Sequence, residues 1–187
     1  MSQTAASPSL PTIAFIGGGN MASAIIGGLI HQGHPASQIE VVEPWAEARE
    51  ALRKNYGIEA QAEAGPALQR AQIVVWAVKP QTFKDAAAQA KAHTQGALHL
   101  SVAAGIRSDS IAQWLGTERI VRTMPNTPAL VGKGMSALYA RPAVSAPERQ
   151  SIEAIMATTG EFLWVDSEPQ LDAVTALSGS GPAYVFY

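Results

Sequence analysis

The stretch TIAFIGGGNMA, residues 12–22, constrains the fold of this chain more than any other part of its sequence. Its first five residues are apolar or β-branched, as expected of a strand that is buried on both faces of a parallel sheet. Three glycines follow at once, and residues 21–30 have the small and apolar composition of a buried helix. The order strand, glycine turn, helix, with Gly17, Gly19 and Ala22 at their spacing, matches the fingerprint of a dinucleotide-binding fold.

Each position of that fingerprint has a physical role. Gly17 allows the tight turn, Gly19 lets a pyrophosphate approach the backbone because it has no Cβ, and Ala22 lets the helix pack closely on the strand. The free N–H groups at the start of the helix then face the phosphates. The alternative interpretation is a turn whose glycines serve packing alone.

A second apolar strand, residues 39–43, favours dinucleotide binding over that alternative. It ends in Glu43, which lies 21 residues beyond Ala22, where this fold places the carboxylate that binds an adenosine ribose. A carboxylate repels a 2′-phosphate, and the next residue, Pro44, has no N–H to offer one. The nearest basic side chain in the sequence, Arg49, falls about one and a half turns into the next helix, from where it could still reach a 2′-phosphate, so NADPH is not excluded. We therefore expect NADH or NADPH as the cofactor, with NADH preferred by about tenfold in affinity.

Residues 13–30 carry no charge over 18 positions, a length that also occurs in membrane spans. Five of these residues are glycine and one is asparagine, and no basic residue precedes the run. The run is therefore interpreted as a buried strand and helix, and no membrane partner is expected. Residues 1–11 also carry no charged side chain and are rich in Ser, Ala and Pro. They do not form the basic region of a signal peptide and are expected to be a disordered leader.

The composition limits the partners and the compartment. Of the 187 residues, 47% are hydrophobic and 15% are charged, which suggests that a ligand, a further domain or another subunit covers part of the surface. A net charge of −2 gives no reason to expect nucleic acid as a partner. Without cysteine, disulfides, thiolate metal sites and cysteine nucleophiles are excluded, and no metal is expected. A reducing cytoplasm is the expected location.

Strands and helices alternate along the chain, which predicts an α/β protein with a doubly wound, mainly parallel Rossmann-type sheet. Further strands are expected near Ile58 and at 72–78, 97–102, 119–123, 133–139 and 161–165. Helices are expected at 44–55, 65–70, 108–115 and 147–159, with Ser108 as an N-cap. His31 and His34 are expected to be solvated at a helix end, and His99 to be a core histidine.

The residues that follow three of these strands are candidate site residues, because ligands of open α/β sheets bind beyond the carboxyl ends of the strands. Lys79 could reach a phosphate or the nicotinamide ribose, and the small residues 103–105 could let a flat ring lie against the backbone. Asn126 lies in a turn made rigid by two prolines and could bind a carboxamide or a carboxylate. The alternatives are a solvated lysine and plain turns.

The sequence changes character after Val165. Residues 166–169 are expected to be a linker and 170–177 a short helix, and the run 178–182 restarts a helix with Pro182 near its first position. The last residues are apolar and aromatic, and a helix of about one turn is not stable alone in water. The chain is therefore expected to be truncated. Its expected domains are a dinucleotide-binding domain at 12–165 and the start of a helical domain at 166–187.

Five segments together resemble the pyrroline-5-carboxylate reductase family, namely IGGGNMASAIIGGL, VVWAVKPQ, SVAAGI, VRTMPNTPALVGKGMSAL and LDAVTALSGSGPAYVF. The resemblance covers nearly all of residues 12–187, and its MPNTP and ALSGSGPAY runs are more specific than a glycine motif. It implies an oxidoreductase that transfers a hydride from NAD(P)H to the C=N carbon of 1-pyrroline-5-carboxylate, giving L-proline in the last step of proline biosynthesis. It also implies a helical domain that dimerises and completes the substrate site.

The resemblance implies three groups of cofactor contacts. Those at the pyrophosphate are Gly17, Gly19, Asn20, Met21 and Ala22. Those beside the ribose are Ala77, Val78, Lys79 and Pro80, and those at the nicotinamide are Val102, Ala103, Ala104 and Gly105. Glu168 matches a position next to the substrate site, where a solvated linker glutamate is the alternative. Ala64 stands where family members often carry asparagine, so one adenine-side hydrogen bond is expected to be missing. The contacts to the substrate carboxylate are implied beyond Tyr187. The isolated chain is therefore expected to be inactive, and the full-length protein to be a homodimer or a larger homo-oligomer.

Two further interpretations stay open at this point. A related β-hydroxyacid-type dehydrogenase or a deazaflavin-dependent oxidoreductase would share the first strand–helix–strand unit. A non-catalytic nucleotide-binding module would share the glycine turn. No catalytic residue is assigned, because reduction of a protonated cyclic imine needs little from the protein beyond positioning and a suitable pocket.

Overall fold

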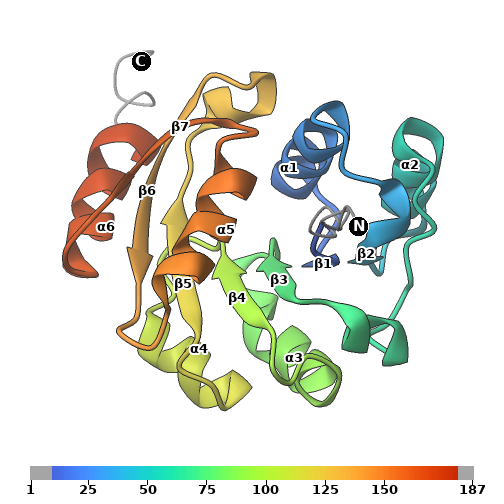
Figure 1. Cartoon of the computed structure of the whole chain (residues 1–187), viewed down its shortest axis with the longest axis horizontal. Coiled ribbons are helices and arrows are strands. Elements are labelled where there is room, and N and C mark those ends of the chain that lie inside the picture. Colours follow the sequence, from blue (N-terminus) through green and yellow to red (C-terminus); the bar gives the residue numbers. More distant parts are fainter. Residues whose placement is uncertain (1–9, 181–187) are drawn as a thin grey trace, which may run out of the picture.

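The structure is a computed structural model that describes residues 10–180, with side chains to residue 177 (Figure 1). Seven strands form one sheet in the order β2-β1-β3-β4-β5-β6-β7. Every pairing is parallel except that of β5 with β6, so the expected doubly wound, mainly parallel sheet is confirmed. The strands are β1 (Ile13–Ile16), β2 (Ile39–Val42), β3 (Ile73–Trp76), β4 (Leu98–Ser101), β5 (Ile120–Met124), β6 (Gly134–Ala140) and β7 (Gly160–Trp164).

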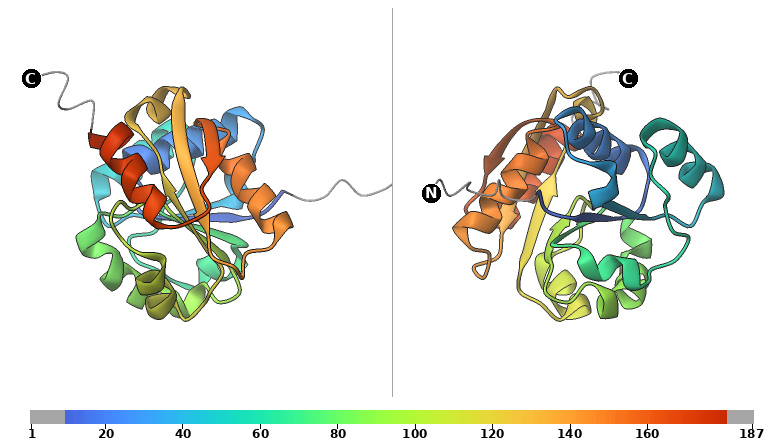
Figure 2. Two further views of the ribbon diagram at one scale, coloured as in Figure 1. Left: turned by 90° about the vertical axis from the view of Figure 1, so that its left-hand side faces the viewer. Right: turned by 45° about the vertical axis from the view of Figure 1, so that its right-hand side comes forward.

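Helices cover both faces of the sheet, as the two views of Figure 2 show. On one face lie α1 (Asn20–His31), α2 (Ala46–Tyr56) and α5 (Ala146–Met156), and on the other lie α3 (Pro80–Ala90) and α4 (Ser108–Leu115). A last helix, α6 (Pro169–Val174), packs against β5 and β6 and continues as the π-helical segment Thr175–Ser180. None of the helices within residues 10–180 is long and apolar enough to cross a membrane.

The central strands have no solvent-facing side. All residues of β1, β3 and β4 are buried. In β1, Ile13 and Phe15 pack in the core beneath α1 and α5, whereas Ala14 and Ile16 pack in the core beneath α3 and α4. A strand with helices on both faces buries every side chain, which explains the uninterrupted apolar runs of β1 and β3. The two polar residues of β4, His99 and Ser101, accept hydrogen bonds inside the core.

The largest departure from the expected elements is α3. No helix was expected between residues 78 and 97, where α3 forms; it begins at Pro80. Proline is favourable at the first position of a helix, because the N–H that it lacks would have had no partner there. No strand forms at Ile58, which is a buried core residue; the nearby pairing is an isolated bridge between Val42 and Gln61. Residues 66–70 form a 3-10 helix rather than an α-helix.

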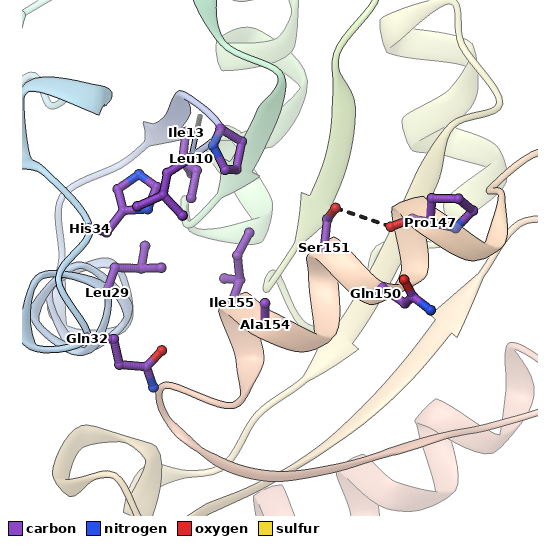
Figure 3. Close-up of a pocket in the computed structure, with 11 residues that line it drawn as sticks. Leu10, Ile13, Leu29, Gln32, His34, Pro147, Gln150, Ser151, Ala154 and Ile155 are labelled. Carbon is purple, nitrogen blue, oxygen red and sulfur yellow. Dashed lines mark hydrogen bonds between the residues drawn. The ribbon is translucent and has the colours of Figure 1, made fainter. Parts of the chain in front are cut away.

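His34 is buried, which corrects the expectation that it is solvated. It is 7% exposed, and its Nε2 atom makes no hydrogen bond of ordinary geometry with the described residues. Burial lowers the pKa of His34 below its usual value. The ring lines a mostly apolar cavity of about 370 Å³ between α1 and α5 (Figure 3). This cavity lies at the start of β1, at the opposite end of the strand from the glycine turn, and contains none of the predicted site residues.

His99 is the buried core histidine that its position in a strand predicts. It is 2% exposed, and its Nδ1 atom accepts a hydrogen bond from the indole N–H of Trp76 at 3.0 Å. Burial, helped by the charge of Arg119, lowers the pKa of His99 to about 4. The unfolded chain takes up this proton near a pKa of about 6.5, so the folded state loses stability as the pH falls from about 6.5 to about 4.

We expect this protonation to reduce the free energy of unfolding by about 2–3 kcal/mol between about pH 7 and pH 4.5. Urea unfolding at the two pH values measures it. The control is His99→Asn, because its amide oxygen can accept the Trp76 hydrogen bond but does not titrate. An equally large pH dependence in that variant would show that His99 is not its source.

Candidate functional site

The glycine turn lies between the carboxyl end of β1 and the start of α1. Gly17 has a φ of 98°, which residues with a side chain rarely adopt, and a Cβ on it would lie 2.5 Å from the carbonyl oxygen of Ala77. Gly19 differs in both respects, because its φ is −72° and a Cβ on it would meet no atom within 4 Å. The packing of the protein itself requires Gly17, whereas Gly19 borders open space.

The N-terminus of α1 begins at that open space. No side-chain cap and no acidic residue occupies its first turn, so its first N–H groups are available to an anion. Gly19 and Asn20 are exposed, while Ala22 is completely buried on the face of α1 that packs on the sheet. A pyrophosphate needs an uncapped helix start with room beside the backbone, and this turn offers both.

The loops after β3 and β4 lie beside the turn at the same edge of the sheet. Val78 comes close to Gly17, since a Cβ on Gly17 would lie 3.3 Å from Val78 Cγ1. Lys79 and Pro80 are exposed, and no ion pair joins Lys79 to any residue of the described range. After β4, Val102 is partly buried and Ala103 is buried, whereas the remaining two candidates, Ala104 and Gly105, are exposed.

A cavity of about 340 Å³ adjoins the turn and joins several predicted site residues. Asn20 and Met21 line it from α1, Val102 from the end of β4, and Asn126 from the loop after β5. The Oδ1 atom of Asn126 accepts a hydrogen bond from the backbone N–H of Met135 at 3.0 Å, which orients the amide NH₂ as a free donor. The volume is in the range of small-ligand sites.

Four further residues line this cavity and were not singled out from the sequence, namely Met124 at the end of β5 and Pro125, Thr127 and Leu130 in the segment that follows it. Met124, Pro125 and Thr127 belong to the same MPNTP run as Asn126, and Leu130 lies two residues beyond that run. The rigid turn was recognisable from its two prolines. The direction of its apolar side chains was not, because it depends on how the turn lies against α1.

Glu43 follows β2 as expected, but its carboxylate points inward. The residue is 6% exposed; its Oε2 atom accepts a hydrogen bond from the backbone N–H of Gly18 at 2.7 Å, and its Oε1 from that of Trp45 at 2.9 Å. The guanidinium of Arg49 donates to the carbonyl oxygens of Glu43 and Pro44, at 2.8 and 2.6 Å. The Glu43 carboxylate therefore joins the loop after β2 to the glycine turn, and the Arg49 guanidinium joins that loop to α2. The carboxylate oxygens retain lone pairs that could accept from ribose hydroxyls.

Glu168 does not line the cavity. Its carboxylate accepts hydrogen bonds from the backbone N–H of Ser108 at 2.5 Å, from the Ser108 hydroxyl at 2.7 Å and from the guanidinium of Arg122 at 2.6 Å. Ser108 is the first residue of α4, and Arg107 takes the N-cap position, which corrects the expected cap. Glu168 supplies the acceptor at this helix start instead. It is also not the solvated linker residue of the alternative interpretation, because its side chain is only 12% exposed.

Comparison with known proteins places this geometry in a family. A family model described as NADP oxidoreductase, coenzyme F420-dependent, matches residues 12–105. A pyrroline-5-carboxylate reductase of Pseudomonas aeruginosa is 47% identical over 180 residues, which are 95% of this chain and 66% of that protein. The chain belongs to the pyrroline-5-carboxylate reductase family. The resemblance stated from the sequence is thereby confirmed.

Solved structures of the reductase family show the same fold. A pyrroline-5-carboxylate reductase from Coxiella burnetii superposes with a TM-score of 0.89 at 36% identity, covering 95% of this chain and 67% of that one. A Plasmodium falciparum pyrroline carboxylate reductase with NADP bound gives a TM-score of 0.80 at 26% identity, covering 94% and 65%. The chain thus spans about two thirds of the length of these reductases.

The parts of the chain that the structure leaves out carry three of the sequence-based expectations. Residues 1–9 of the expected leader lie outside the described residues, as do residues 181–187, including Pro182 and the end of the ALSGSGPAY run. The helix expected to end at Leu177 continues without a break to Ser180. The division into domains at Val165 stays a prediction for this reductase chain.

Proposed function

We propose that this chain is the cofactor-binding part of a pyrroline-5-carboxylate reductase, which reduces 1-pyrroline-5-carboxylate to L-proline with NADH or NADPH. The observation that carries the proposal is the glycine turn, where Gly19 borders open space at an uncapped helix start. The membership of the chain in this family supports the assignment of 1-pyrroline-5-carboxylate as the substrate. Because the chain spans about two thirds of its relatives, the activity of the whole protein remains part of the proposal.

In this proposal the residues of the chain bind and orient, and the bound dinucleotide supplies the hydride. Residues 17, 19–22 and 77–80 hold the pyrophosphate and the ribose, and residues 102–105 border the nicotinamide. Asn126, with its amide fixed by Met135, donates a hydrogen bond to the carboxamide or to the substrate carboxylate. The carboxylate oxygens of Glu168 already accept three hydrogen bonds. We therefore propose that Glu168 acts on the substrate side indirectly, by positioning the start of α6, which directly follows it.

The finer proposal concerns the cofactor. Glu43 places a carboxylate 2.7 Å from the Gly18 nitrogen, close to where the adenosine ribose would lie, so it disfavours a 2′-phosphate. Arg49, which covers the same loop, acts in the opposite direction. We expect NADH to bind about tenfold more tightly than NADPH, a difference of about 1.4 kcal/mol.

Calorimetric titration of both nucleotides at fixed ionic strength tests separately whether the chain binds a dinucleotide and whether Glu43 sets the preference for NADH. We expect Glu43→Gln, which keeps one acceptor oxygen and removes the charge, to bring the two affinities together. Arg49→Met is the matched control and should weaken NADPH alone; urea unfolding verifies that both variants fold. Absence of binding to the wild type would contradict the dinucleotide site. An unchanged ratio in Glu43→Gln would contradict only the role of Glu43.

Turnover is assayed as loss of NADH absorbance with 1-pyrroline-5-carboxylate. We expect the 187-residue chain to bind NADH without robust turnover, and a chimera that adds the last third of the Pseudomonas aeruginosa reductase to form proline. A chimera that binds NADH but forms no proline would favour a non-catalytic nucleotide-binding module. The low charged fraction and the lack of cysteine support two further parts of the proposal, a homodimer or larger homo-oligomer and a cytoplasmic location.

A further inference from the structure

The indole side chain of Trp45 is exposed to solvent. It is 73% exposed, whereas Trp76 is completely buried and Trp114 and Trp164 pack against the two cores. Trp164 also donates its indole N–H to Glu153. A large aromatic side chain gains free energy when it is covered, so an exposed one next to a ligand site is a candidate contact.

The backbone of Trp45 is fixed to the glycine turn. Its N–H donates to the carboxylate of Glu43, and the same carboxylate accepts from the N–H of Gly18. Its carbonyl oxygen accepts from the N–H of Arg49 at 3.1 Å, and the Arg49 guanidinium binds the two carbonyl groups that precede Trp45. The exposed ring therefore stands on a loop that is held at both ends.

The geometry of the fold gives this ring a partner. With a pyrophosphate at Gly19, the adenosine half of a dinucleotide extends toward β2 and its ribose lies near Glu43. The base then continues beyond the ribose to the loop that follows β2, and that loop carries Trp45, the residue before α2. An adenine ring is flat and stacks well on an indole, which typically improves affinity by about tenfold or more.

We propose that the indole of Trp45 is the surface on which the adenine of the bound dinucleotide stacks. This inference rests on the proposed dinucleotide site and adds a residue that recognises the base. Stacking reads the flat face of the base and not its hydrogen-bonding edge. The adenine end therefore discriminates weakly between purines, and nicotinamide hypoxanthine dinucleotide binds within about threefold of NADH.

ADP-ribose and nicotinamide mononucleotide are the probes, because each carries one half of the cofactor. Trp45→Ala weakens ADP-ribose and NADH by about tenfold and leaves nicotinamide mononucleotide unchanged, whereas Trp45→Phe retains most of the affinity. Leu163→Ala is the matched control, since Leu163 is an exposed apolar residue, 41% exposed, on β7 at the sheet edge opposite β2. It leaves the affinity for all three ligands unchanged. Urea unfolding verifies the fold of each variant.

Tryptophan fluorescence gives an independent readout. ADP-ribose, which has no nicotinamide ring, changes the fluorescence of the wild type and not that of Trp45→Phe. If the wild type binds ADP-ribose and Trp45→Ala binds it equally well, the stacking role is wrong and the dinucleotide site stands. If the wild type binds neither NADH nor ADP-ribose, the proposed function fails together with this inference.

Discussion

Gly19→Ala is expected to unfold like the wild type and yet lose about 10- to 100-fold in affinity for NADH, whereas Gly17→Ala is expected to lose much of its stability. A Cβ on Gly19 meets no protein atom and its φ is ordinary, so the added methyl group occupies only space that the pyrophosphate would fill. A Cβ on Gly17 would lie 2.5 Å from a backbone oxygen at a φ of 98°. Overpacking and backbone strain together cost about 3–5 kcal/mol.

Urea unfolding and calorimetric titration with NADH, applied to both variants, measure these effects. Gly65→Ala is the control, because Gly65 has extended backbone with a φ of −160° and no atom would lie within 4 Å of its Cβ. It should change neither stability nor affinity. Undiminished NADH binding by Gly19→Ala would show that the pyrophosphate does not approach this glycine.

Glu168→Ala is expected to reduce the free energy of unfolding by about 3–5 kcal/mol, because it leaves a buried guanidinium without its counter-charge. The side chain of Arg122 is 6% exposed, and its Nε atom has no hydrogen-bond partner in the described residues. The backbone N–H and the hydroxyl of Ser108 lose their acceptor in the same substitution. Chemical denaturation at neutral pH measures the loss.

Two variants separate a structural role of Glu168 from a role limited to the substrate. Arg122→Met is expected to destabilise the chain by itself, and the double variant Arg122→Met/Glu168→Ala to be at least about 1 kcal/mol more stable than the sum of the two single effects predicts. Additive losses would deny the coupling. If Glu168→Ala unfolded like the wild type, the ion pair would contribute nothing, and the role beside the substrate would be the better interpretation.

The pH range of this contribution follows from the pKa of Glu168. Burial raises that pKa, but the hydrogen bonds from Ser108 and Arg122 and the charge of Arg122 outweigh burial and hold it below its usual value. A carboxyl group with a depressed pKa stabilises the folded state above its ordinary pKa of about 4.5 and loses that effect as the pH falls through the lower value. The His99 effect develops at higher pH, between about 6.5 and 4, so the two can be told apart.

The sequence by itself determined the sheet and the edge at which the site lies. The side chains of an apolar run such as residues 72–78 are all removed from water only when both faces of the strand are covered, which requires helices on both sides of the sheet. The turn at residues 17–19 and the strand ends at 77–80 and 102–105 then had to meet, because parallel strands end at one edge. Local composition carries this information, so no knowledge of distant contacts was needed.

Only the tertiary structure decided what individual polar side chains do. Glu168 stands in a polar linker, and its partners Arg122 and Ser108 lie 46 and 60 residues away in the sequence. Likewise, the carboxylate of Glu43 turns inward because the Gly18 N–H, 25 residues away, lies within its reach. His34 is covered where the end of α1 meets α5. A long polar side chain can form its hydrogen bonds in several directions. The segment that the fold brings beside it determines which of these directions it takes.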